Sequence, residues 1–315
     1  MLHNLTDEIA RLKHERNAVI LAHNYQVGEV QDIADYVGDS LGLSQQAAKT
    51  DAEVIIFCGV HFMAETAAIL SPNKRVLIPD LEAGCSLASS ITADDLRRWK
   101  ADHPGAEVVS YVNTTAEVKA ESDYCCTSSN AVQVVKSIPE DTEILFLPDM
   151  FLGNHVKKMT GRRNISVWAG ECHVHAAVQP AEILAAREAH PHADFMVHPE
   201  CGCTTPAMYL ASENDDSMEG AHILSTGGMM LHARDSASTE FVVATETGIL
   251  HALRKQNSEK TFHAVAESMI CRFMKMITLE KVLQSLTDDV HEVNVRPEIA
   301  ERARLPIERM LAVPA

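Results

Sequence analysis

Short runs of consecutive apolar residues recur along the chain, and three of them end in polar residues. These runs occupy positions 19–25, 108–113 and 195–200. Continuous apolar runs of this length are typical of strands buried on both faces of a parallel sheet. Stretches with apolar positions at helical spacing separate the runs and predict connecting helices. The pattern therefore predicts an α/β protein whose parallel sheets are covered by helices.

The three runs are evenly spaced, which indicates an internal repeat. From His23 to Tyr111 is 88 residues, and from Tyr111 to His198 is 87. A lone cysteine follows each of these positions after 62, 61 and 73 residues. The alternative is that strands recur at loose intervals, as in any α/β protein. The cysteines at the three positions are Cys85, Cys172 and Cys271.

Further apolar runs fill each repeat. The first unit covers the step from Cys58 to Cys85 in 27 residues, so we expect it to lack one strand–helix element that the other two units contain. Second strands are expected at 54–58, 123–126 and 222–225, and strands that end in an acid at 144–149 and 241–246.

We expect three pseudo-symmetric, three-layer αβα units with short parallel sheets around a central active site. The units are predicted at 1–97, 98–182 and 183–271, and helices within 272–315 are expected to complete the first unit. Helical patterns predict helices at 5–16, 32–49, 132–137, 180–190 and 267–286, with another beginning at Pro297.

Composition and charge narrow the classes of partner. Hydrophobic residues make up 46% of the chain and charged residues 23%, as in an ordinary globular protein. The 27 basic and 44 acidic residues give a net charge of −17, which disfavours nucleic acid and anionic membrane surfaces. No apolar run approaches the roughly 20 residues that cross a bilayer. We therefore expect a cytoplasmic protein with no nucleic-acid or membrane partner, in which helix N-termini and hydroxyls hold any anionic substrate.

Eight cysteines are too few for a disulfide scaffold in a chain of 315 residues. Three pseudo-equivalent cysteines would converge at the centre of a three-unit protein. Zinc sites usually supply cysteines in closely spaced pairs, whereas an iron–sulfur cluster accepts widely spaced thiolates. With three thiolates, one iron of a four-iron cluster stays open and acts as a Lewis acid, which suits dehydration chemistry. Burial without chemistry is the alternative for any single cysteine.

The other cysteines and a histidine pair carry weaker signals. Cys58 and at least one of Cys125 and Cys126 are expected in the core. The C-x-C pair at 201–203 could bind metal, form a redox pair or consist of ordinary loop cysteines. The histidines at 173 and 175, which follow Cys172, could bind metal, support a ligand or lie at the surface.

Polar residues at strand ends are the candidate site, because ligands of parallel α/β sheets lie beyond the carboxyl ends of the strands. Hydroxyls next to expected helix starts are candidates for holding phosphate or carboxylate. The strand-end candidates are His23, Tyr25, Tyr111, Asn113, His198 and Glu200, and the hydroxyl candidates are Ser40, Ser128, Ser225 and Thr226.

The chain resembles the quinolinate synthase family in motifs that span nearly its whole length. The matching segments are LAHNYQ at 21–26, QDIADYVGDSL at 31–41, FMAE at 62–65, YVN at 111–113, TS at 127–128 with Asn130, VHPEC at 197–201 and STG at 225–227.

This resemblance implies three homologous α/β domains around a [4Fe–4S] cluster held by Cys85, Cys172 and Cys271. The implied reaction condenses iminoaspartate with dihydroxyacetone phosphate to quinolinate, phosphate and two waters, in de novo NAD biosynthesis. A functional link to an aspartate oxidase or dehydrogenase follows, because the imine substrate is unstable. Some family members carry the third cysteine in a C-x-x-C-x-x-C run that permits a regulatory disulfide, but Cys271 stands alone.

Roles for individual residues are hypotheses at this point. Glu200 is the expected base, with a pKa raised by a closed site. His23, Tyr25 and His198 would donate to or orient the substrate. The remaining strand-end and hydroxyl candidates, Tyr111, Asn113, Ser40, Ser128, Ser225 and Thr226, would hold its carboxylates and phosphate. The alternatives are another open-iron hydro-lyase, an iron–sulfur sensor and a zinc hydrolase.

Overall fold

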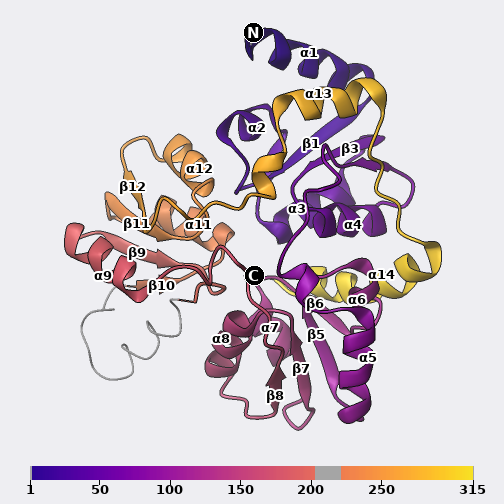
Figure 1. The fold of residues 1–315 in the computed structure, drawn as a ribbon, viewed down its shortest axis with the longest axis vertical. Coiled ribbons are helices and arrows are strands. Elements are labelled where there is room, and N and C mark those ends of the chain that lie inside the picture. Colours follow the sequence, from indigo (N-terminus) through magenta and orange to yellow (C-terminus); the bar gives the residue numbers. More distant parts are fainter. Residues whose placement is uncertain (1, 203–220, 315) are drawn as a thin grey trace.

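A computed structural model gives the fold, and it describes residues 2–202 and 221–314. In these described residues, twelve strands form three separate four-stranded sheets (Figure 1). The first sheet contains β1 (Ala18–His23), β2 (Tyr36–Gly38), β3 (Val54–Cys58) and β4 (Arg75–Leu77). The second contains β5 (Glu107–Tyr111), β6 (Tyr124–Cys126), β7 (Ile144–Leu147) and β8 (Ile165–Val167). The third contains β9 (Asp194–Val197), β10 (Ala221–Ile223), β11 (Glu240–Ala244) and β12 (Thr261–Ala264).

The three sheets share one topology. Their strand orders are β2-β1-β3-β4, β6-β5-β7-β8 and β10-β9-β11-β12, and every pairing is parallel. In each sheet the first strand of the unit is central, and its residues are almost fully buried. The predicted α/β class with three short parallel sheets is confirmed.

The prediction that the first unit lacks a strand is wrong. The missing strand is β2, which is only three residues long and lies inside the segment 32–49 that was predicted as one helix. That segment holds the end of α2 (Gly28–Ile33), then β2, then α3 (Ser40–Lys49). Asp39 begins α3 by accepting a hydrogen bond from the N–H of Gly42. By sheet order, β3 therefore corresponds to β7, and not to the strand at 123–126.

Helices connect the strands. They are α1 (Leu2–Glu15), α4 (His61–Leu70), α5 (Ala93–Asp102), α6 (Ala116–Lys119), α7 (Ala131–Lys136), α8 (Met150–Thr160), α9 (Pro180–Ala189), α11 (Thr226–Asp235), α12 (Ile249–Gln256), α13 (Leu279–Asp288) and α14 (Pro297–Ala312). Within the described parts of the chain, no helix combines the length and apolar character that crossing a membrane requires.

The predicted helix at 267–286 begins later than expected. Residues before Thr278 form a turn that carries Cys271 and a short 3-10 helix (Met274–Met276), and α13 begins only at Leu279. The Thr278 side chain accepts a hydrogen bond from the N–H of Lys281 and so fixes this start. The apolar residues between 267 and 277 are therefore spaced as in a helix but pack against the core from an irregular loop.

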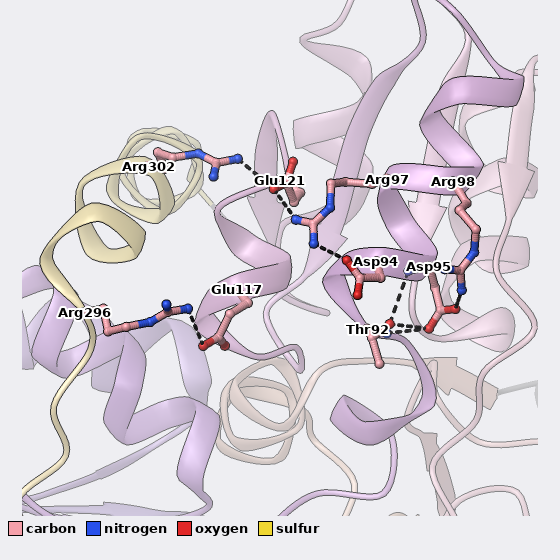
Figure 2. A network of polar contacts seen from close by, with 9 residues as sticks. All are labelled: Thr92, Asp94, Asp95, Arg97, Arg98, Glu117, Glu121, Arg296 and Arg302. Atoms are coloured by element: carbon pink, nitrogen blue, oxygen red, sulfur yellow. Dashed lines mark hydrogen bonds and ion pairs between the residues drawn. The ribbon is translucent and has the colours of Figure 1, made fainter.

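The two C-terminal helices lie against different units. α13 packs on α1 and β3, whereas α14 packs on β6 and α6 and also touches α4 (Figure 1). Figure 2 shows the polar contacts that fasten α14: Glu121 accepts hydrogen bonds from Arg97 of α5 at 2.7 Å and from Arg302 of α14 at 2.8 Å. The C-terminal segment thus ties the first unit to the second.

Candidate active site

The carboxyl ends of the three sheets open onto one cavity of about 60 Å³. Its volume exceeds the roughly 10–15 Å³ that a single water needs. Residues from all three units line it, so the cavity exists only where the units meet. Among the sequence candidates, its lining includes His23, Tyr25, Ser40, Cys85, Tyr111, Asn113, Ser128, Cys172, His198, Glu200, Thr226 and Cys271.

Two histidines hold equivalent positions at strand ends. His23 is the last residue of β1, and His198 directly follows β9. In both, ring atom Nδ1 accepts a hydrogen bond from the backbone N–H two residues later, Tyr25 at 3.1 Å and Glu200 at 3.3 Å. A neutral ring that accepts at Nδ1 carries its proton on Nε2. Burial lowers the pKa of His23 to about 3 and that of His198 to about 4, so both are neutral donors at pH 7.

In the second unit, Tyr111 ends β5, and its hydroxyl donates a hydrogen bond to Oε1 of Glu200. Burial raises the pKa of Tyr111 well above its usual value, which keeps the hydroxyl protonated. Two residues further on, Asn113 also lines the cavity, and its buried Oδ1 has no hydrogen-bond partner among the described residues. An unpaired buried amide oxygen beside a cavity marks a position for a ligand donor or a water.

The hydroxyl candidates divide into two groups. Ser40 and Thr226 are the first residues of α3 and α11 and line the cavity, as does Ser128, whose Oγ lies 3.2 Å from Nε2 of His198. Ser225 lies behind this surface. Its Oγ accepts a hydrogen bond from the N–H of Gly228, and it is not among the described residues that line the cavity. Ser225 shapes the site by capping α11.

Sequence reasoning missed Asp39, which lines the same wall. Oγ of Ser129 lies 2.7 Å from Oδ2 of Asp39 and 2.9 Å from Oγ of Ser225. These contacts join the helix starts of all three units, so the free N–H groups of α3 and α11 face the same space. The signal in the sequence was the equivalence of Asp39 and Ser225, each of which directly precedes a cavity hydroxyl.

The three candidate cysteines sit in the same local turn in each unit. The carbonyl groups of Cys85, Cys172 and Cys271 accept hydrogen bonds from the N–H four residues later, in Ser89, Ala176 and Lys275. All three thiols are free and partly exposed, and all line the cavity. Burial raises the pKa of Cys85 to about 12 and also raises the pKa of the other two. Burial therefore favours the thiol form, His175 opposes this effect at Cys172, and a bound metal cation would favour the thiolates.

The remaining cysteines behave differently. Cys58, Cys125 and Cys126 are fully buried in strands, as expected of core residues. Cys201 is buried and disulfide-bonded, and Cys203 lies outside the described residues.

Glu200 is the most constrained group of the site. Burial would raise its pKa, but His198, His175 and Tyr111 outweigh burial and lower the pKa to about 2. His175 is the cation among them: despite its burial, Cys172 and Glu200 raise the pKa of this ring to about 10. Its Nδ1 lies 3.0 Å from Oε2 of Glu200. The expectation of a raised pKa at Glu200 is therefore wrong, because it left out His175. Glu200 is already ionised and can accept a proton, although its lowered pKa makes it a weaker base than a free carboxylate.

The histidine pair beside Cys172 splits into two roles. His173 is exposed at the rim, with Nδ1 2.7 Å from Oγ of Ser86. His175 is buried and stacks on His198 with ring centroids 5.1 Å apart. Only the second is positioned to influence Glu200.

Thr245 completes a chain of two hydrogen bonds and one ion pair that the sequence did not reveal. It follows β11, and its Oγ1 lies 2.5 Å from the hydroxyl of Tyr25 and 2.9 Å from Nε2 of His175. A continuous path therefore runs from Tyr25 through Thr245 and His175 to Glu200. Thr245 holds two side chains of the site in fixed orientations.

Replacing Thr245 by Val keeps the shape but removes both contacts. Each buried polar group left without a partner costs about 1–3 kcal/mol, and Tyr25 and His175 would no longer be held in place, so we expect Thr245→Val to lower kcat by about tenfold or more. Thr245→Ser keeps the hydroxyl and should retain most of the activity. Wild-type kcat in Thr245→Val would contradict a positioning role for this hydroxyl.

The loop that carries Cys172 depends on a glycine. A Cβ at Gly170 would lie 2.4 Å from Oγ of Ser90 and 2.5 Å from the backbone oxygen of Pro148. We expect Gly170→Ala to destabilise the protein by about 1–3 kcal/mol, the usual range for overpacking, and to displace Cys172. Gly84, beside Cys85, is the matched control, since a Cβ there meets its nearest atoms only at 3.8 Å. Thermal melting of both variants tests this, and equal melting temperatures would contradict it.

Comparison with known proteins agrees with this geometry. A family model described as quinolinate synthetase A protein matches residues 7–312. The chain belongs to the quinolinate synthase family. A quinolinate synthase of Mycobacterium sp. (strain KMS) is 58% identical over 306 residues, which cover 97% of this chain and 91% of the relative. One from Mycobacterium tuberculosis is 56% identical over 97% of this chain and 88% of its own. One from Thermus thermophilus is 57% identical over 98% of this chain and 97% of its own.

Membership in this family makes the protein an enzyme and agrees with the resemblance seen in the sequence motifs. The match extends from α1 to the end of α14, so it includes all three units and every residue of the cavity.

Proposed function

We propose that this protein condenses iminoaspartate with dihydroxyacetone phosphate to give quinolinate, phosphate and two waters, in NAD biosynthesis, with a [4Fe–4S] cluster held by Cys85, Cys172 and Cys271. One observation carries the proposal: strand-end acids and bases, helix-start hydroxyls and three free cysteines line a single cavity at the junction of three units. The named relatives of the chain support it.

The anionic parts of the substrates have a suitable wall. Ser40 and Thr226 present hydroxyls at the starts of α3 and α11, each helix ten residues long. Helix N-termini attract phosphate and carboxylate through free N–H groups and the helix dipole. Ser128 adds a further donor, and the unpaired Oδ1 of Asn113 can accept a hydrogen bond from a hydroxyl or amino group of a substrate. This wall holds anions without a net positive chain.

The donor set fits an iron–sulfur cluster better than one zinc ion. The sulfurs around a single zinc ion lie within about 4 Å of one another, given Zn–S distances near 2.3 Å. Among the described residues, the three cysteines do not form a group whose ligand atoms all lie within 4.8 Å. When bound, a cluster with three thiolate ligands supplies an open iron that acts as a Lewis acid toward a leaving hydroxyl.

The chain's own residues supply proton transfer and orientation. Glu200 is ionised and would take a proton from the carbon that forms the new bond, while His175 balances its charge. Nε2–H groups of His23 and His198 would donate to carbonyl or carboxylate oxygens of the substrates. The hydroxyl of Tyr25, held by Thr245, would add a further donor.

The imine substrate also implies a supplier. Imines of this kind hydrolyse in water, so an oxidation of aspartate by an oxidase or a dehydrogenase would have to deliver iminoaspartate close to this enzyme. Transient encounter in the cytoplasm is enough for this link.

An anaerobic assay tests the proposal. Cluster-loaded enzyme is given dihydroxyacetone phosphate with and without freshly generated iminoaspartate, and both quinolinate and inorganic phosphate are measured. We expect the two products in equal amounts and only when both substrates are present. An open-iron hydro-lyase that acts on a hydroxy acid would release no phosphate, and that outcome would overturn the assignment.

A further inference from the structure

A second group of potential metal ligands lies in the third unit, away from the cavity. Glu240 is the first residue of β11, His263 lies in the neighbouring β12, and His190 directly follows α9. Glu246 lines the cavity two residues after β11 ends, so the five residues of this strand, about 16 Å long, separate the two sites. This group therefore belongs to the amino edge of the sheet, opposite the active site.

The three side chains converge on one point. Nδ1 of His190 lies 2.9 Å and Nε2 of His263 lies 3.0 Å from the same carboxylate oxygen, Oε1 of Glu240. The two rings stack, with centroids 3.8 Å apart and planes 21° apart. All three ligand atoms lie within 4.8 Å of one another. The side chains are 26–38% exposed, so solvent and ions reach them.

We propose that His190, Glu240 and His263 form a binding site for one first-row divalent transition metal ion of the zinc type. Two imidazoles and one carboxylate, with water in the remaining position, are a common zinc ligand set. Imidazole nitrogens favour such ions over Mg²⁺ and Ca²⁺, which require oxygen ligands. The net charge of −17 also attracts cations.

Metal binding changes the present contacts in a defined way. Each ring nitrogen now faces Oε1 of Glu240, and the hydrogen bond from His190 lowers the pKa of this carboxyl group. Nitrogen-to-zinc distances are about 2.0–2.1 Å, so the ion would enter between the rings and the carboxylate while these half-exposed side chains shift outward. The ion would link the end of α9 to β11 and β12.

A neighbouring group provides an internal comparison. His232 has Nε2 3.1 Å from Oδ2 of Asp194, and the His222 ring lies beside it with centroids 4.1 Å apart. The hydroxyl of Ser236 also donates to Oδ2 of Asp194, at 2.9 Å. Because a protein hydroxyl already occupies that oxygen, we assign the metal to the Glu240 group.

Zinc binding to cluster-loaded enzyme tests the proposal. Wild type and variants are dialysed anaerobically against micromolar zinc chloride, and zinc per chain is measured by mass spectrometry. We expect the His190→Ala/His263→Ala double variant to hold about one Zn²⁺ fewer than wild type, since a set of this kind binds one ion. His192→Ala, an exposed histidine beside the site, should bind as much as wild type. Equal zinc in the double variant and wild type would overturn the proposal.

A third variant separates metal binding from folding. Glu240→Gln keeps an acceptor for both rings but removes the charge. Loss of even an outer hydrogen-bond partner of a ligand costs about 10–100-fold in metal affinity, so we expect at least this weakening. Zinc should raise the melting temperature of wild type and His192→Ala, but not of Glu240→Gln. Unchanged zinc affinity in Glu240→Gln would contradict the site. Quinolinate formation in chelator should be the same in all four proteins, which keeps this test independent of the proposed reaction.

Discussion

Replacing Glu200 by Gln should reduce quinolinate formation by about 10²–10⁴-fold, the usual contribution of a general base. The amide keeps the size of the side chain and accepts the hydrogen bond from Tyr111, but it cannot take a proton. Because the three cysteines are untouched, iron content should stay at the wild-type level. Steady-state kinetics under anaerobic conditions measure the change in kcat.

Glu171→Gln is the matched control for this variant. Glu171 is exposed and lies next to Cys172, so the same substitution there should leave kcat unchanged. Near-wild-type turnover in Glu200→Gln would mean that another group removes the proton, and it would contradict the assignment of Glu200 as the base.

Replacing Cys85 by Ala should abolish turnover and remove the brown colour that the proposed cluster would give the protein. The substitution removes one of three thiolates from the proposed cluster, and a cluster with two protein ligands is not retained. Ala at Cys172 or Cys271 should give the same result, since the three turns are equivalent. Visible absorption and turnover of anaerobically purified protein measure both effects.

Cys125→Ala supplies the control, because Cys125 is fully buried in β6 and does not belong to the described lining of the cavity. This variant should lose some stability and keep its colour. A coloured, active Cys85→Ala enzyme would show that Cys85 is not a ligand.

The apolar runs and their regular spacing along the chain were enough to predict much of the fold. Continuous apolar runs such as the one ending at His23 indicate a buried parallel strand, and the even spacing from His23 to Tyr111 and His198 revealed the repeat. Strand β2 was hidden because three residues give no period, and Tyr36 and Val37 also fit helical spacing. The irregular turn before Thr278 was missed for a similar reason: its apolar residues pack in the core without forming a helix.

The residues of the candidate site also fall into those that the sequence predicted and those that it did not. Strand-end residues and lone cysteines were predictable, because parallel topology brings them to one edge. Thr245 and the role of His175 were not, because their importance comes from contacts between residues far apart in the sequence. The ionised state of Glu200 follows from those same contacts, and no local pattern encodes it.

The most direct test of the account is the iron, acid-labile sulfide and zinc content of the protein purified without oxygen. The three-cysteine site predicts about four iron and four sulfide per chain. Any zinc should be bound only at the site of His190, Glu240 and His263. Zinc at the cysteines in place of iron and sulfide, for example on the close group of Cys172, His175 and Glu200, would contradict the account. So would a protein that holds no metal at the cavity and still forms quinolinate.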